Sequence, residues 1–305
     1  MSTVVVLLCL IGLVLRLVWW SLEPLRAARR RSSDAIQDET EREAWLQEYS
    51  ASYDPDFSIV IPAYNESKRL PAMLDELAIY LQSRKGLSYE IIIVDDGSVD
   101  DTSKTAKIVS ARFFPTDRVR VARLRKNRGK GGAVREGASR ARGQRILLVD
   151  ADGATRITDL ERLEQALNKF SQHEPVIAFG SRAHLVHSDV VARRSPIRNL
   201  LMNGFHLIVR LVGGVYNIRD TQCGFKLFNR AALPALLSIH LERWAFDVEL
   251  LYIAQRLHYH LVEIPVDWTE IPGSKLSILR DSLRMARDIT CLRLAYTLGI
   301  WHLPS

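Results

Sequence analysis

The chain has 305 residues, of which 47% are hydrophobic and 25% are charged, so it can bury a large core as one α/β domain or two small ones. Its three cysteines lie far apart, which excludes a disulfide framework and a cysteine-based zinc pattern and favours a reducing compartment. The formal net charge of +7 indicates an anionic partner, and nucleic acid, lipid headgroups or phosphorylated substrates would all suit it.

The chain opens with an apolar run, residues 4–20, that only Arg16 interrupts. At about 1.5 Å per residue, a helix over residues 1–22 can cross the ~30 Å hydrocarbon layer, and Trp19 and Trp20 suit its interface. A basic cluster follows the run and no Lys or Arg precedes it, so the positive-inside rule places the rest of the chain in the cytosol. A cleaved signal peptide, the alternative, carries its basic residues before the apolar run.

A linker over residues 23–55, first basic and then acidic, leads to the globular part of the chain. There, short apolar runs alternate with segments whose apolar residues recur at helical spacing. Strands are predicted over residues 57–63, 90–94, 119–124, 145–149 and 176–179, with a helix after each of the first four. This alternation predicts an α/β fold, a Rossmann-like, mostly parallel sheet flanked by helices on both faces. Ligands bind beyond the carboxyl ends of the strands in such sheets.

The second half of the chain is less regular. Helices are expected over residues 197–211 and 246–256, and short strands over 225–228 and 261–268. The stretch 276–301 is basic and amphipathic, so it either lies in a membrane surface or packs on the sheet as an ordinary helix. The chain is therefore divided into an anchor, a linker, an α/β domain and a C-terminal helix, with the bounds 1–22, 23–55, 56–275 and 276–305.

Two pairs of acidic residues follow predicted strands, Asp95 and Asp96 after the second and Asp150 and Asp152 after the fourth. Positions two apart in an extended segment point the same way, so Asp150 and Asp152 present two carboxylates to one spot. Like charges ~4 Å apart repel by up to ~4 kcal/mol at an effective dielectric of ~20. A divalent cation relieves this repulsion, and an all-oxygen site selects Mg²⁺ or Mn²⁺. The alternative makes Asp95, Asp96 and Asp152 helix caps or turn residues.

Four segments resemble, in the same order, the motifs of the family 2 inverting glycosyltransferases of GT-A fold, namely residues 57–66, 94–102, 126–137 and 150–155. The resemblance covers roughly residues 57–296. Within the family, segments 150–155, 220–226 and 243–247 and the N-terminal anchor look most like the dolichyl-phosphate β-glucosyltransferase branch. That branch transfers glucose from UDP-glucose to dolichyl phosphate, which implies an enzyme of protein N-glycosylation at the endoplasmic reticulum membrane.

The resemblance also implies a site for the nucleotide-sugar. It makes Asp150 and Asp152 an Asp-x-Asp pair, with Asp152 as the direct ligand of a metal that bridges the two donor phosphates. Pro62, Tyr64, Glu66 and Asp96 would surround the base and ribose. Lys130 could touch the donor phosphates, and Lys275 resembles a residue that closes over the diphosphate. The full expected set is Pro62, Tyr64, Glu66, Asp96, Lys130, Asp150 and Lys275.

The acceptor side needs positive charge, because a lipid phosphate must be held against an anionic donor. The resemblance places phosphate-binding arginines in two segments, which here contain Arg182, Arg193, Arg194 and Arg198. Arg193 and Arg194 could instead be solvated or meet anionic headgroups. Asp220 matches the catalytic Asp of the family, and Asp247 is the rival candidate. A phosphate nucleophile is mostly dianionic at neutral pH, so either carboxylate could simply hold arginines in an ion-pair network.

Two other classes of protein compete with this interpretation. A non-catalytic module that binds anionic lipid or nucleic acid explains the basic segments, but the acidic pairs would repel its ligand, so no nucleic-acid partner is expected. A dinucleotide-dependent oxidoreductase is excluded, because no Gly-x-Gly-x-x-Gly follows the first strand. Among enzymes, a dolichyl- or other polyprenyl-phosphate mannosyltransferase is the alternative. The sequence predicts no oligomeric state.

Overall fold

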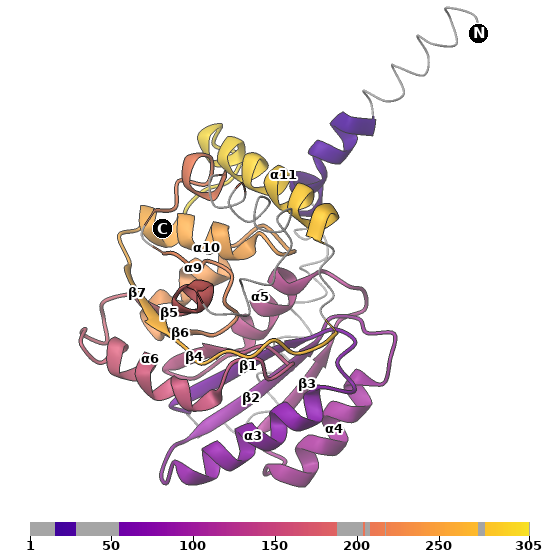
Figure 1. The fold of residues 1–305 in the computed structure, drawn as a ribbon, viewed down its shortest axis with the longest axis vertical. Helices are drawn as coiled ribbons and strands as arrows, with labels where there is room; N and C mark the ends of the chain where they lie inside the picture. Colours follow the sequence, from indigo (N-terminus) through magenta and orange to yellow (C-terminus); the bar gives the residue numbers. More distant parts are fainter. Residues whose placement is uncertain are drawn as a thin grey trace, which may run out of the picture.

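In the part of the chain that the computed structural model describes, seven strands form one sheet (Figure 1). The structure describes residues 16–28, 55–187, 204, 208–216, 218–273 and 278–304. The strand order is β3-β2-β1-β4-β6-β5-β7, and the strands are β1 (Phe57–Ala63), β2 (Tyr89–Asp95), β3 (Val119–Arg123), β4 (Arg145–Leu148), β5 (Val176–Ser181), β6 (Lys226–Asn229) and β7 (His260–Pro265). Each lies within a few residues of a strand that the sequence predicts.

The pairing of the strands brings several of their ends to one edge of the sheet. β1 pairs in parallel with β2 and β4, and β2 pairs in parallel with β3, so the carboxyl ends of these four strands meet there. β6 runs antiparallel between β4 and β5, and β5 pairs in parallel with β7. The expected mostly parallel sheet is confirmed.

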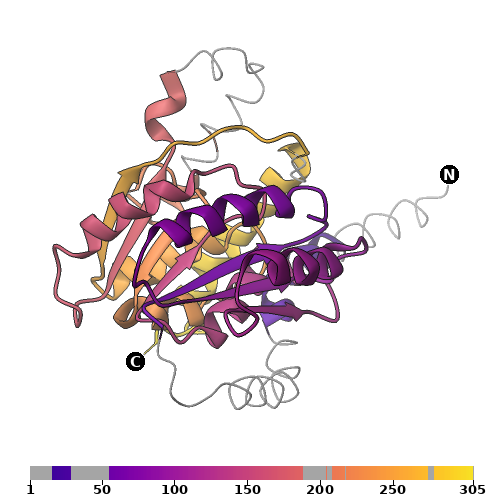
Figure 2. The ribbon, with the colours of Figure 1, turned by 90° about the horizontal axis from the view of Figure 1, so that it is seen from below.

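Helices cover both faces of this sheet. Ile59 and Ile61 of β1 contribute to one core and Val60 to the other, because side chains alternate along a strand. The first core is covered by α3, α4 and α6, which lie side by side in Figure 2, and the second by α5, α9 and α10. The helices are α3 (Leu70–Ser83), α4 (Thr102–Phe113), α5 (Lys130–Arg140), α6 (Leu160–Leu167), α9 (Leu233–Leu237), α10 (Phe246–Arg256) and α11 (Ile278–Thr297), with 3₁₀ turns η1 (Ile157–Asp159), η2 (Ala183–His187) and η3 (Arg230–Ala232).

The leucine spacing that predicts the first helix is the face that α3 buries. Pro71 lies in the first turn, where backbone NH groups have no partner within the helix, so it costs no hydrogen bond. The helix therefore starts close behind β1 and keeps the connecting residues 64–69 at the edge of the sheet. The buried leucines of this face are Leu70, Leu74, Leu77 and Leu81.

The C-terminal helix α11 packs beside α10, on the side away from the sheet (Figure 1). Its buried face belongs to the same hydrophobic core as α5, α9 and α10. On the opposite face, Leu283 and Leu294 are 58% and 55% exposed. Arg287 ties α11 to the N-terminal helix, because its Nη2 lies 3.0 Å from Glu23 Oε2. The buried residues of α11 include Met285, Ile289 and Leu292.

Several expectations fall outside the described residues. These are most of the anchor (1–15), most of the linker (29–54) and the side chains of Arg193, Arg194, Arg198 and Lys275. Residues 16–28 are helical, with a turn at Leu22, so the start of the expected linker continues the preceding helix. Across the described ranges, no helix combines the length and the apolarity that crossing a membrane requires. The anchor stays a prediction.

Candidate active site

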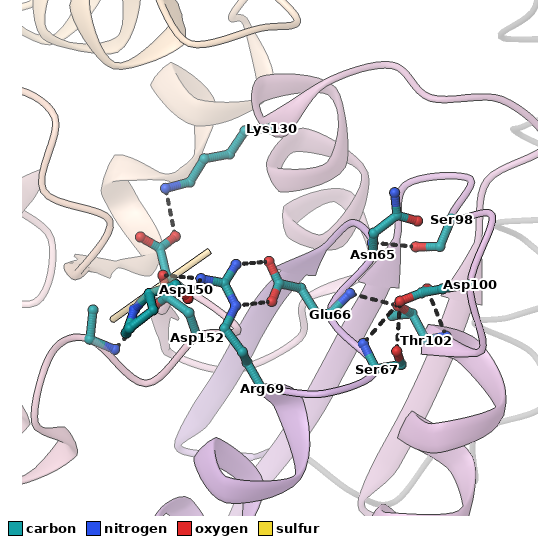
Figure 3. A network of polar contacts seen from close by, with 12 residues as sticks. Asn65, Glu66, Ser67, Arg69, Ser98, Asp100, Thr102, Lys130, Asp150 and Asp152 are labelled. Carbon is teal, nitrogen blue, oxygen red and sulfur yellow. Dashed lines mark hydrogen bonds and ion pairs between the residues drawn. The ribbon is translucent and has the colours of Figure 1, made fainter. Parts of the chain in front are cut away.

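A pair of carboxylates lies just beyond the carboxyl end of β4. Figure 3 shows the side chains of Asp150 and Asp152 next to each other, between two cations. The Nζ of Lys130, the first residue of α5, lies 2.5 Å from Asp150 Oδ1. On the other side, Arg69 Nη1 lies 3.7 Å from Asp152 Oδ2. The edge of the sheet at which the sequence predicts a ligand therefore carries alternating positive and negative groups.

The two members of the pair differ in their electrostatics. Burial opposes the ionisation of Asp150, but nearby cations, Lys130 foremost, outweigh it and lower the pKa of this carboxyl. Burial and the charge of Asp150 together raise the pKa of Asp152. Burial makes the larger contribution and the charge of Asp150 the smaller one, and together they outweigh the nearby cations Arg69 and Lys130.

The pair suits a divalent cation that arrives with a substrate. The side chain of Asp150 is 36% exposed and that of Asp152 is 26% exposed, so both are open to a ligand. Within the described part of the chain, no group of three or more His, Cys, Asp or Glu side chains could hold a metal alone. A cation on this pair would take its remaining oxygen ligands from phosphates and water, as Mg²⁺ commonly does.

Gly224, just before β6, lies against the Asp150 carboxylate and leaves room for it because it has no side chain. A Cβ at this position would lie 2.1 Å from Asp150 Oδ2 and 2.4 Å from its Cγ. β6 pairs antiparallel with β4, with Lys226 opposite Leu148, so the residues before β6 pass the end of β4. Any side chain at Gly224 would displace the Asp150 carboxylate. The sequence motif contains this glycine, but only the structure shows what it touches.

The end of β1 and the connection after it carry three of the residues expected to bind the nucleotide. Pro62 and Tyr64 are partly buried, and Glu66 is 8% exposed. Arg69 donates two hydrogen bonds to the Glu66 carboxylate, with Nε–Oε2 at 2.7 Å and Nη2–Oε1 at 2.5 Å (Figure 3). Arg69 thus links this connection to Asp152. The sequence analysis missed it, although its spacing of three residues from Glu66 was an available signal.

Asp96 lies beneath the loop that leads into α5. It is 3% exposed, and its carboxylate accepts hydrogen bonds from the backbone NH groups of Arg128 and Gly129, both at 2.7 Å. Burial raises the pKa of Asp96 to about 7, although these NH groups favour the charged form. Asp95 accepts the NH of Ser98 at 2.9 Å, which is the turn role that the alternative interpretation gives it.

Arg182 and Asp220 form a closed pair. Asp220 accepts hydrogen bonds from the backbone N, Nε and Nη2 of Arg182 at 2.9, 2.7 and 2.9 Å. The guanidinium lies 5.4 Å from the ring centroid of Trp268. Burial opposes the ionisation of Asp220, but Arg182 outweighs it and lowers the pKa of this carboxyl. Arg182 is the one expected acceptor arginine that falls within the described residues.

Asp247, the other catalytic candidate, belongs to a buried ion pair. Its Oδ1 lies 2.7 Å from Lys226 Nζ, and the two side chains are 4% and 1% exposed. Burial raises the pKa of Asp247, while Lys226 acts in the opposite direction. Nothing in the sequence marks a strand lysine as the partner of this helix residue. Both carboxylates considered for catalysis, Asp220 and Asp247, therefore lie against cations.

We predict strong energetic coupling between Lys226 and Asp247. Lys226→Met leaves an uncompensated buried carboxyl and should lower the free energy of unfolding by about 3–5 kcal/mol, and Lys226→Met/Asp247→Asn should cost much less than the sum of the single changes. Urea denaturation of the four proteins measures the coupling. The same cycle on the surface pair Asp117–Arg118, 3.5 Å apart, is the control, where at most about 1 kcal/mol is expected. Additive effects at Lys226 and Asp247 would contradict the prediction.

Known proteins resemble the chain in sequence and in fold. Residues 58–237 match the family model described as glycosyl transferase family 2. A protein named dolichyl-phosphate β-glucosyltransferase from Homo sapiens is 51% identical over 255 residues, 81% of this chain and 78% of that protein. Its namesake from Dictyostelium discoideum is 49% identical over 255 residues, 81% of this chain and 77% of that protein.

A solved structure shares the fold. Glucosyl-3-phosphoglycerate synthase from Mycobacterium tuberculosis, in complex with Mn²⁺, UDP-glucose and glycerol 3-phosphate, superposes with a TM-score of 0.52 at 18% identity, covering 87% of this chain and 85% of that one. At this identity the likeness concerns the fold alone. The matched model and the similar sequences go further. They show that the chain is a glycosyltransferase and belongs to glycosyl transferase family 2.

Proposed function

We propose that the chain transfers glucose from UDP-glucose to dolichyl phosphate and releases UDP and dolichyl β-D-glucosyl phosphate. The observation that carries this proposal is the identity of about half to two proteins of that name over 81% of the chain. The paired charges of the site support it, because they suit two phosphate-bearing substrates. A non-catalytic lipid- or nucleic-acid-binding module is not supported, since the matched proteins are enzymes.

In the proposed reaction, an oxygen of the acceptor phosphate attacks the anomeric carbon of glucose opposite the UDP group. The new C–O bond forms as the bond from the anomeric carbon to the UDP oxygen breaks, and UDP leaves with the electron pair. The attack inverts the anomeric centre. A phosphate monoester with its second pKa near ~6 is mostly dianionic at neutral pH, so no side chain needs to remove a proton.

Asp150 and Asp152 would hold Mg²⁺ or Mn²⁺ together with the donor diphosphate. The bound ion supplies positive charge that stabilises the departing UDP. Both carboxylates are accessible, and burial together with the neighbouring charge of Asp150 opposes the ionisation of Asp152, which a bound cation would favour. The fold relative from Mycobacterium tuberculosis was solved with Mn²⁺ and UDP-glucose.

The remaining donor contacts are proposed from the positions of the described side chains and, for Lys275, from the family resemblance. Lys130, already at Asp150, is placed to reach the donor phosphates. Lys275, outside the described residues, would close over the diphosphate. The base and ribose would lie at the ends of β1 and β2, against Pro62, Tyr64, Glu66 and Asp96.

For the acceptor, we propose that Arg182 binds the lipid phosphate and that Asp220 orients Arg182. Their bidentate pairing uses the Nε and Nη2 side of the guanidinium and fixes its plane, so that the Nη1 edge is the one that would meet a phosphate. Asp220 is committed to Arg182 and its pKa is lowered, which makes it a poor proton acceptor. Arg193, Arg194 and Arg198 would complete the acceptor site.

The reaction and its metal are tested together by incubating the protein with dolichyl phosphate and either UDP-glucose or GDP-mannose. Transfer from UDP-glucose is expected with Mn²⁺ and no transfer with EDTA, and the activity should recover when Mn²⁺ is restored.

Asp152→Asn should lower kcat/KM by about 10²-fold or more, because the ion loses a ligand. Asp117→Asn, at a side chain 73% exposed, is the matched control. Transfer from GDP-mannose alone, or full activity in EDTA, would overturn the proposal.

Asp220→Asn separates orientation from base catalysis. If Asp220 orients Arg182, the KM for dolichyl phosphate should rise about tenfold while kcat stays within about twofold of the wild type, because the asparagine keeps only part of the pairing. A general base contributes about 10²–10⁴-fold, so its loss would appear in kcat instead. Steady-state kinetics with the acceptor varied distinguish the two, and a large fall in kcat would sink the orienting role.

We further propose that one surface of the molecule docks on the bilayer that holds the acceptor. Large exposed apolar side chains gather on residues 16–28, residues 208–216 and α11, and Arg287 lies 4.7 Å from the Trp20 ring, which joins two of these segments. The apolar residues 4–15 directly precede this surface, and tryptophans suit a membrane interface. The surface includes Leu17, Val18, Trp19, Trp20, Leu22, Leu211, Leu283, Leu294 and Leu298.

Leu294→Glu/Leu298→Glu should slow transfer to dolichyl phosphate embedded in vesicles by about fivefold or more, and leave transfer to detergent-dispersed acceptor unchanged, because buried charge weakens interfacial binding. Ile79→Glu/Ile108→Glu, at side chains 64% and 62% exposed on α3 and α4, is the control. Equal rates in vesicles would remove this surface from membrane docking.

The proposed orientation places the catalytic domain on the cytosolic face of the endoplasmic reticulum membrane. Protease added to sealed microsomes should then digest the domain. If the domain is protected instead, it faces the lumen and the proposed orientation is wrong.

A further inference from the structure

Residues 240–244, here called the strap, pack directly against the start of α5. Gly132 N donates a hydrogen bond to Glu242 O at 3.0 Å. A Cβ on Gly131 would lie 2.4 Å from Leu241 O, and one on Gly129 would lie 2.5 Å from Glu242 O. These glycines therefore let the strap approach the loop that carries Lys130. The contact leaves little room for either segment to move independently.

The strap reaches both sides of the proposed donor site. The Trp244 ring centroid lies 6.0 Å from Lys130 Nζ, on the side of Asp150. On the side of Asp96, the Glu242 carboxylate lies 3.3 Å from Arg128 Nε. The backbone NH of the same arginine donates a hydrogen bond to the Asp96 carboxylate. A shift of the strap would therefore disturb the Lys130–Asp150 pair and the Asp96 loop together.

The buried carboxylate of Glu249 binds the beginning of the strap. Glu249 of α10 has a side chain 0% exposed, and its Oε2 accepts the backbone NH groups of His240 and Leu241 at 2.7 and 2.6 Å. Its Oε1 lies 2.8 Å from Nδ1 of the His240 ring. Charge-assisted hydrogen bonds of this kind are among the stronger ones, so Glu249 fixes both the backbone and the ring at the beginning of the strap.

The end of the chain completes this arrangement. Tyr296 of α11 donates its hydroxyl to Glu249 Oε1 at 3.2 Å. Trp301, which is 5% exposed, stacks on the His240 ring with a centroid distance of 4.3 Å and an interplanar angle of 6°. The C-terminal part of the chain thus contacts both His240 of the strap and Glu249, which binds the strap. In Figure 1, α10 lies between α11 and α5.

We propose that His240, Glu249 and Trp301 are positioning residues for the donor site. They touch no substrate and act by seating the strap, which in turn sets Lys130 and the Asp96 loop. The inference rests on the proposed function in one respect, the contact of Lys130 and Asp96 with the donor. It assigns Trp301, together with Tyr296, an indirect role in donor binding.

The test compares Trp301→Ala with the conservative Trp301→Phe and with Leu303→Ala, a control at a side chain 37% exposed two residues further on. Trp301→Ala should raise the KM for UDP-glucose about fivefold and leave the KM for dolichyl phosphate within about twofold, because only the donor side contacts the strap. Trp301→Phe should restore most of the donor KM, and Leu303→Ala should leave both unchanged.

A second measurement needs no substrate. The rate at which an acylating reagent modifies Lys130, followed by mass spectrometry, should rise about threefold or more in Trp301→Ala and stay unchanged in Leu303→Ala, because reactivity follows exposure and ion pairing of the amine. If the chain proves to use another donor, the labelling rate of Lys130 still shows whether Trp301 positions the strap. The proposed function and the positioning role can therefore fail separately. Should Trp301→Ala not fold, Tyr296→Phe, which removes one hydroxyl from Glu249, should change donor KM and Lys130 labelling in the same direction. A lowered Tm with unchanged donor KM and unchanged labelling would show a purely structural role and overturn the inference.

Discussion

The repulsion between Asp150 and Asp152 is the constraint on which the site depends. Two like charges ~4 Å apart repel by up to ~4 kcal/mol at an effective dielectric of ~20. Lys130 lies on one side of the pair and Arg69 on the other, yet burial and the charge of Asp150 together keep the pKa of Asp152 raised. On the proposed function, a doubly charged ion that enters with the donor diphosphate would supply the further positive charge that this carboxyl lacks.

Three cations near the pair, Arg69, Arg182 and Lys226, are each paired with a further carboxylate. Arg69 is paired with Glu66, and Arg182 is paired with Asp220. Lys226 is paired with Asp247, and its charge also acts on Asp150. Long cationic side chains lose much rotamer freedom when they are fixed, and the paired carboxylate fixes each of them before any substrate arrives. On this account Asp220 and Asp247 serve the site by orienting charge. On the proposed function, the attacking phosphate is already mostly dianionic at neutral pH, so neither carboxylate has to act as a general base.

The sequence predicts the strands and the acidic pairs well because both signals are local. An unbroken apolar run such as residues 91–94 is typical of a strand buried on both faces, and acids directly after such runs are therefore expected at the edge of the sheet. The partners of these acids are not local. Lys226 meets Asp247 across 21 residues and Arg69 meets Asp152 across 83, and no residue spacing predicts such contacts. The C-terminal helix was ambiguous for a related reason, because an amphipathic pattern states that one face is buried without saying against what.

The antiparallel strand explains why the site can join residues from both halves of the chain. In a wholly parallel sheet, only segments that follow strands reach the carboxyl edge. β6 runs the other way between β4 and β5, so its preceding residues, 220–225, arrive at the edge where the residues after β4 leave it. Gly224 consequently lies against Asp150, and Lys226 begins β6 opposite Leu148. The acid pair from the first half and the Arg182–Asp220 pair from the second are brought within electrostatic reach by this one reversal of strand direction.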